Sequence, residues 1–364
     1  MTVNTIGAAP QLDPELKKIA ESSLQAMKYS FAAVAADPDA AAPGDSVEEH
    51  FRAAVRSLKP DALGRVRDQA RALVGSPATR TREFGEYGKA EPAAYRSTGF
   101  GSAVAASRLQ ISDTALKEAL KRRPKVQIDI KPPKPPKRPK LSIKVPKVTA
   151  VRLHFDWVHC VDETDGEWPG SDTILFGGLA VDENGNAKKV DAYKVRPNNQ
   201  PDDGFDDGDK RTFSYPKGTF ASFPVAGKAD WPRWYSAIVV MAEEDHGGFS
   251  GALQMAWVKA APEIKKKVEK YVGDFAAEYV GEAFGQLIGE IVGWVVEAFA
   301  GWIIGLLMDD LFKPGFTYIG LHTPVAAGYE KGWWTDYRAP SGRFTFKGHG
   351  GKYTVDCHWQ VDHS

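Results

Sequence analysis

Acidic side chains gather in three short stretches that could bind a hard cation. The stretches are 162–172, 202–209 and 243–245, and each follows or separates apolar segments. Carboxylate oxygens are the ligands that Ca²⁺ prefers, and this ion takes about six to eight oxygens at once. Asp206, Asp207 and Asp209 form a cluster that is similar to Asp-rich calcium turns, although its spacing is not that of an EF-hand loop. The alternative is a set of solvated turns, because Asp and Gly favour turns in any protein.

Histidine and nucleophile patterns indicate no particular reaction. The chain has no nucleophile elbow, P-loop, HExxH motif or dinucleotide fingerprint. His154 and His159 are five residues apart on a predicted strand, so they face opposite sides and cannot share a metal there. His246 stands beside Glu244 and Asp245, which leaves open a hydrolase that uses the acidic loops. We expect a protein that is not an enzyme.

Strands with period-two alternation must position these loops. Val151, Leu153, Phe155 and Trp157 alternate with polar residues, which indicates a half-buried strand from Thr149. The same reasoning predicts further strands at 173–181, 189–195, 212–225, 235–242, 317–321, 343–347 and 353–361. Short strands separated by Gly, Asp and Asn turns are typical of an antiparallel sandwich.

The order of strands and acidic loops resembles a C2-type β-sandwich domain. Ser171-Asp172-Thr173-Ile174 stands where that family has Ser-Asp-Pro-Tyr after an acidic loop, and the acidic stretch 243–245 follows a late apolar strand. The Pro-Tyr pair is absent, and a segment of about 50 residues interrupts the last strands. The resemblance covers about residues 149–250 and 315–364. It implies Ca²⁺ ligands at Asp165, Asp172, Glu243 and Asp245, and docking on membranes.

The interrupting segment, about 261–312, carries glycines at every fourth position. These glycines are Gly281, Gly285, Gly289, Gly293, Gly301 and Gly305, with Glu297 at the step that the series skips. Glycine inside an exposed helix costs about 1 kcal/mol relative to alanine. The pattern therefore predicts a Gly-zipper helix or helical hairpin whose small face permits close approach of another element.

A helical projection places Glu290 and Glu297 with the glycines and puts large apolar residues on the opposite face. Each acid costs about 3 kcal/mol at the centre of a bilayer, which opposes a lone spanning helix. We expect instead an oligomer that turns its Gly/Glu face inward and its apolar face, with Trp294 and Trp302, toward lipid. The alternative is a hairpin packed on the protein's own sheet.

Residues 124–148 form a basic, proline-rich linker. Its cations include Lys131, Lys134, Lys137, Arg138 and Lys140, and its prolines exclude a helix or a central strand. It is either a solvated spacer or a contact for anionic lipid headgroups. Nucleic acid is not an expected partner, because no aromatic residues interleave the charges.

Residues 1–123 are predicted to be a helical region. Asp13-Pro14 and the capping box Ser46/Glu49 open two helices, Pro60 opens a third, and Ser112 or Asp113 opens the last. Between 75 and 107 we expect a loop-rich connection. Cys160 and Cys357 are either free buried thiols or one bridge between strands.

Charge is balanced at 47 basic and 47 acidic residues, and no Sec-type signal is visible. We therefore expect a cytoplasmic protein, or one exported without a signal peptide, that is membrane-associated when active. The predicted fold is α+β and multidomain: helices at 1–123, the linker, and a C2-like sandwich at 149–364 with the helical insertion. The predicted function is that of a pore-forming or toxin-like effector that homo-oligomerises on anionic lipids, with Ca²⁺ as a cofactor. The alternative is a soluble structural or interaction module.

Overall fold

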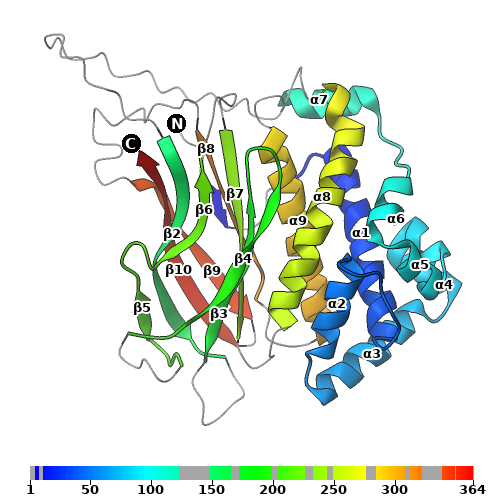
Figure 1. Cartoon of the computed structure of the whole chain (residues 1–364), viewed down its shortest axis with the longest axis horizontal. Helices are drawn as coiled ribbons and strands as arrows, with labels where there is room; N and C mark the ends of the chain where they lie inside the picture. The colour runs from blue at the N-terminus through cyan, green and yellow to red at the C-terminus, as the bar shows by residue number, and fades with distance from the viewer. Residues whose placement is uncertain are drawn as a thin grey trace, which may run out of the picture.

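The computed structural model of the chain describes residues 5–7, 11–122, 148–164, 172–198, 204–225, 233–243, 249–275, 284–307, 312–321, 338–348 and 350–363. Two antiparallel β-sheets face one another, and a layer of helices covers the outer face of one of them (Figure 1). The fold is therefore α+β, with an N-terminal group of helices followed by antiparallel sheets.

Most of the N-terminal region is helical. Its helices are α1 (Pro14–Ala36), α2 (Val47–Arg56), α3 (Pro60–Val74), α4 (Pro77–Phe84), the 3₁₀ turn η1 (Gly85–Lys89), α5 (Pro92–Thr98), α6 (Phe100–Ala106) and α7 (Asp113–Arg122). The predicted starts of α1 and α2 are confirmed, since Asp13 accepts from the backbone of Glu15 and Ser46 accepts from that of Glu49. These bonds satisfy amide groups that have no partner inside the helix.

The expectation of a loop-rich connection at 75–107 is wrong. Ser76 caps α4, and prolines stand in the first turn of α4 and α5. Gly85 and Gly99 adopt φ angles of 59° and 76° and end those two helices. The segment is thus a series of short helices separated by glycine. No single amphipathic stripe is long enough to reveal them.

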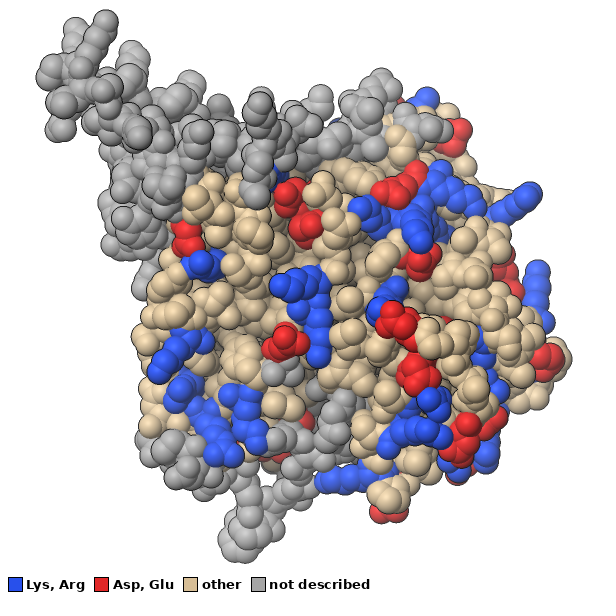
Figure 2. Space-filling model, in the orientation of Figure 1, with Lys and Arg blue, Asp and Glu red and all other residues tan. Residues whose placement is uncertain are grey.

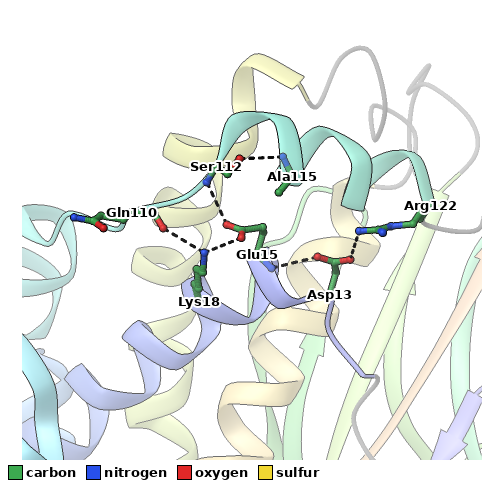
Figure 3. A network of polar contacts seen from close by, with 7 residues as sticks. All are labelled: Asp13, Glu15, Lys18, Gln110, Ser112, Ala115 and Arg122. Carbon is green, nitrogen blue, oxygen red and sulfur yellow. Dashed lines mark hydrogen bonds and ion pairs between the residues drawn. The ribbon is translucent and has the colours of Figure 1, made fainter.

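Helix α7 is fastened to the start of α1 by polar contacts (Figure 3). Glu15 accepts from the backbone of Ser112 at 3.3 Å and from Lys18 at 2.7 Å. At the other end of α7, Arg122 donates to Asp13 at 3.0 Å. The last described residue before position 148 is therefore held beside the first turn of α1.

The strands are β1 (Thr5–Gly7), β2 (Val148–Asp162), β3 (Ile174–Val181), β4 (Ala187–Val195), β5 (Lys210–Thr212), β6 (Thr219–Pro224), β7 (Arg233–Glu243), β8 (Gly315–Leu321), β9 (Arg338–Gly348) and β10 (Gly351–His363). One sheet has the order β1-β8-β7-β3-β4, and the other has the order β5-β2-β10-β9, with β6 also paired to β2. Of the strand predicted at 212–225, only 219–224 forms a strand of its own, β6, while Thr212 is the last residue of β5. Strand β1 was not predicted.

Strand β7 shows how the layers are held together. Tyr235, Ala237, Val239 and Met241 belong to the core between the two sheets. Trp234, Ile238, Val240 and Ala242 belong to the core shared with the helices. Because side chains alternate along a strand, β7 is apolar on both faces.

The segment inserted between β7 and β8 is two helices that cover the outer face of the sheet β1-β8-β7-β3-β4. Helix α8 spans Phe249–Phe275 and α9 spans Phe284–Leu307. The predicted start near 261 is wrong, because α8 begins earlier and contains Pro262 in its interior. In Figure 1, α9 and α8 lie between the sheet and the N-terminal helices. The domain boundaries at 123 and 148 remain a prediction.

Candidate functional site: helix α9 and the acidic end of the sandwich

Helix α9 is the one described helix that is long and apolar enough to cross a membrane, over Phe284–Leu306. In an 18-residue window of this stretch the mean hydropathy is 1.7, and 67% of the window is buried. A core helix of a soluble protein has the same features, so length and composition alone do not decide its role.

The first glycines of α9 face the sheet. A Cβ atom added to Gly285 would lie 2.3 Å from the backbone oxygen of Glu183, and one added to Gly289 would lie 2.5 Å from the hydroxyl of Ser236. At Gly293 the neighbour is the ring of Phe316, 2.7 Å away. These three glycines therefore bring the axis of α9 close to the turn after β3 and to strands β7 and β8.

The last two glycines of the helix behave differently. A Cβ atom on Gly301 or Gly305 would meet nothing within 4 Å, and both residues are exposed. Close packing thus accounts for the first half of the glycine series, and its partner here is the chain's own sheet. A role of this series in oligomerisation stays a prediction, and Gly281 lies outside the described residues.

The opposite face of α9 packs on the N-terminal helices through aromatic rings. Phe299 stacks on Phe51 of α2 with ring centroids 5.4 Å apart, and Trp302 meets Phe31 of α1 edge-on at 5.9 Å. Two lysines of α1 lie over the tryptophan rings, Lys17 at 6.0 Å from Trp294 and Lys28 at 5.5 Å from Trp302. In this structure both predicted lipid-facing tryptophans contact α1.

The two acidic residues of α9 have polar partners. Glu290 is buried and accepts from Gln286, one turn earlier, at 2.6 Å. Glu297 forms an ion pair with Lys313 at 2.5 Å. Such pairing lowers the cost of keeping carboxylates in an apolar helix.

A buried lysine joins α8 to the N-terminal helices. Lys267 is 2% exposed, and its ammonium donates to Ser22 at 2.6 Å, to Ser107 at 2.7 Å and to Tyr87 at 3.0 Å. All three partners are neutral hydroxyls. Burial therefore lowers the pKa of Lys267 to about 8, a shift that the charge of Glu86 partly opposes. Sequence reasoning missed this residue, although Lys267 lies on the same helical stripe as Ile264 and Tyr271.

Replacing Lys267 with Met is expected to stabilise the protein at neutral pH by roughly 1–2 kcal/mol. The pKa difference between folded and unfolded chain corresponds to a cost of roughly 3 kcal/mol for the buried charge, from which the lost hydrogen bonds must be subtracted. The hydroxyls keep other partners, since Ser22 bonds Tyr87 and Ser107 bonds the carbonyl of Val104. Urea unfolding followed by circular dichroism measures the change.

The pH dependence provides the check on this prediction. The folded chain releases the Lys267 proton near pH 8, whereas the unfolded chain keeps it to about pH 10.5. The free energy of unfolding of the parent should therefore increase as pH rises between these values, and the K267M variant should lack this increase. The exposed neighbour Lys266 is the control, and K266M should change stability by no more than about 0.5 kcal/mol. A destabilised K267M variant with an unchanged pH slope would contradict the interpretation.

At one end of the sandwich, the predicted acidic residues come together around Thr164. Its amide and hydroxyl donate to the two carboxylate oxygens of Asp172 at 2.8 and 2.6 Å, and its hydroxyl also lies 3.2 Å from Glu243. The Tyr353 hydroxyl donates to the same Asp172 carboxylate. Two of the four predicted calcium ligands, Asp172 and Glu243, therefore share one threonine.

The second acidic cluster lies beside the first. Asp207 accepts from the backbone of Glu163 at 2.7 Å, and Asp209 accepts from that of Asp206 at 3.0 Å. Partial burial, together with the charges of Asp172, Asp206 and Asp207, raises the pKa of the Glu163 carboxyl. Loops far apart in sequence thus build one negatively charged end.

Within the residues that the structure describes, no three acidic, histidine or cysteine side chains are placed to bind a metal ion. The Asp172 carboxylate accepts hydrogen bonds from Thr164 and Tyr353 and thereby links two segments that are distant in the sequence. Asp165 and Asp245 lie outside the described residues, so calcium binding stays a prediction. The linker residues Lys131, Lys134, Lys137, Arg138 and Lys140 also lie outside the described residues, so their contact with anionic lipid stays a prediction.

Cys160 and Cys357 are free, buried thiols, so the expectation of two free thiols is confirmed and a disulfide between them is excluded.

Sequence reasoning did not predict a pair of histidines on neighbouring strands. His154 on β2 lies directly opposite His358 on β10, with ring centroids 5.0 Å apart. Spacing along one strand does not show such a pair, because the register between two strands decides it.

Comparisons with known proteins identify no relative: no protein-family model, curated protein or solved structure matches the chain.

Proposed function

We propose that the chain is a non-enzymatic, membrane-active protein that holds α9 folded against its sandwich and releases it on a membrane. The observation that carries this proposal is the separation of the two cores. Among the described residues, the core between the sheets contains no member of α8 or α9, whereas both helices belong to the helical core. Helix α9 can therefore leave the sheet while the sandwich keeps its own interior.

The chemistry of α9 supports an apolar destination. Insertion into a bilayer is favoured by about 0.3–0.6 kcal/mol for each large apolar side chain, whereas each acidic side chain costs about 3 kcal/mol. A single helix gains little from that balance. Several copies that turn Glu290 and Glu297 inward avoid the cost, and the released faces of Gly285, Gly289 and Gly293 then permit close helix contacts. We propose homo-oligomerisation on this basis.

The sandwich would locate the surface. In this proposal its C2-like character lies in the acidic end around Thr164, where Ca²⁺ would neutralise Asp172, Glu243 and the neighbouring aspartates. Lys and Arg gather over the lower part of the sandwich, near the strands labelled β3 and β5, whereas both charge signs are mixed over the helices (Figure 2). Basic side chains of that kind attract anionic lipid headgroups.

A second candidate function is that of a soluble structural or interaction module. The observation that favours it is the fit of the glycines to the chain's own sheet, which gives them a role in self-packing. In that case α9 stays in place throughout the life of the protein.

Dye release from vesicles separates the two functions. Phosphatidylcholine vesicles that contain phosphatidylglycerol and an entrapped self-quenching dye are mixed with the whole chain, with millimolar calcium or with a chelator. We expect release that is faster with calcium and faster than from vesicles of phosphatidylcholine alone. If the protein neither releases dye nor co-sediments with the anionic vesicles, the membrane proposal fails and the soluble module stands.

A further inference from the structure

A polar pocket lies on the outer face of the sheet β5-β2-β10-β9, which is the sheet that α8 and α9 do not cover. Its volume is about 560 Å³, and its lining residues are Asp156, Ser341, Gly342, Arg343, Asp356, Cys357 and His358. All of them come from the three adjacent strands β2, β10 and β9.

A bulge in β2 aims Asp156 into this pocket. Trp157 pairs with Asp356 and Phe155 pairs with Cys357, so Asp156 is the extra residue between two consecutive pairs. Its carboxylate lies 3.0 Å from Nδ1 of His358, whose side chain is 4% exposed. The bulge thus orients a buried imidazole with a carboxylate on a neighbouring strand.

A second pair of planar side chains lies next to the first. Arg343 donates to both oxygens of Asp356, at 2.5 Å from Nε and 3.1 Å from Nη2. The guanidinium lies 4.9 Å from the centre of the Trp157 ring, which also carries the Lys210 ammonium at 4.1 Å. The bidentate geometry and the ring fix the plane of the guanidinium.

The charges of the pocket indicate the class of ligand. Arg343 pairs with Asp356, and Asp156 lies beside His358. An anionic ligand therefore meets two carboxylates, and a cationic ligand meets the Arg343 guanidinium. What remains is a concave surface on which fixed donors and acceptors alternate, with the Ser341 hydroxyl at its side. A ligand hydroxyl both donates and accepts, and it suits such a surface better than a charged group does.

We propose that this pocket binds a neutral saccharide. Adjacent hydroxyls of a sugar ring match the alternation of carboxylate, guanidinium and imidazole groups on the three strands, and the pocket volume suits a small ligand. The site is independent of α9 and requires no release of the helix, so its test needs no membrane.

Saturation-transfer NMR on the whole chain provides the test. The probes are glucose, galactose, mannose and N-acetylglucosamine, together with their charged counterparts glucose 6-phosphate and glucosamine. We expect transfer to at least one neutral sugar and a weaker signal from the charged analogue of the same ring. No transfer to any neutral sugar, or a stronger signal from a charged analogue, would overturn the proposal.

Variants assign the signal to the pocket. D156N keeps the shape of the side chain but loses the carboxylate, and R343K keeps the charge but loses the bidentate guanidinium. Each variant should weaken binding about tenfold or more. T345A alters an exposed residue of β9, the strand of Arg343, at a position outside the pocket. This variant should bind the sugar as the parent does. Thermal unfolding establishes that each variant is folded, and equal binding by folded D156N would exclude this site.

Discussion

The G285A variant is expected to lose about 1–3 kcal/mol of unfolding free energy, the usual cost of adding atoms to a well-packed interior. The added methyl group would lie 2.3 Å from the backbone oxygen of Glu183, with the carbonyl carbon at 2.7 Å. Backbone atoms cannot rotate away as a side chain can, so α9 must shift from the sheet. Urea unfolding of the whole chain measures the loss.

The matched control is the same substitution later in the same helix. Gly301 is exposed, and its Cβ would meet nothing within 4 Å. Alanine there should stabilise the protein by up to about 1 kcal/mol, because alanine favours the helix over glycine. Equal effects of G285A and G301A would show that the glycines do not serve the contact between α9 and the sheet.

Cross-linking α9 to the sheet is expected to abolish dye release if the helix must leave. The S236C/G289C variant brings two cysteine Cβ atoms close together, since a Cβ on residue 289 would lie 3.0 Å from that of Ser236. Disulfides need about 3.5–4.5 Å between Cβ atoms, which a small outward shift of the helix provides. The oxidised variant should release dye only at the rate of vesicles alone, and reduction should restore release.

The S236C/G301C variant controls for the oxidation itself. Residues 289 and 301 are about 18 Å apart along the helix, so thiols at 236 and 301 cannot bridge. Its dye release should be unaffected by oxidation. If the cross-linked S236C/G289C variant releases dye as fast as its reduced form, α9 does not leave the sheet and the proposed mechanism is wrong.

Local signals in the sequence were enough to predict many of the elements. Asp13-Pro14 and Ser46/Glu49 mark helix starts because a capping side chain and its amide partner are within four residues of one another. The alternation from Val151 to Trp157 predicts a strand for the same reason, because side-chain direction follows backbone period. The errors lie where local signals compete, as at Pro262 inside α8 and in the short helices between 75 and 107.

The sequence by itself determined that α9 has a small face and a large apolar face, and that acidic loops end several strands. Only the tertiary structure decided what each face contacts: Glu183, Ser236 and Phe316 for the first glycines, and Phe31 and Phe51 for the aromatic face. It also decided that His154 meets His358, that Asp156 occupies a bulge, and that Lys267 is buried among hydroxyls. The reason is physical. Periodicity records which side of an element is apolar or small, whereas the partner of that side depends on sheet register and on packing between segments that lie apart in the sequence.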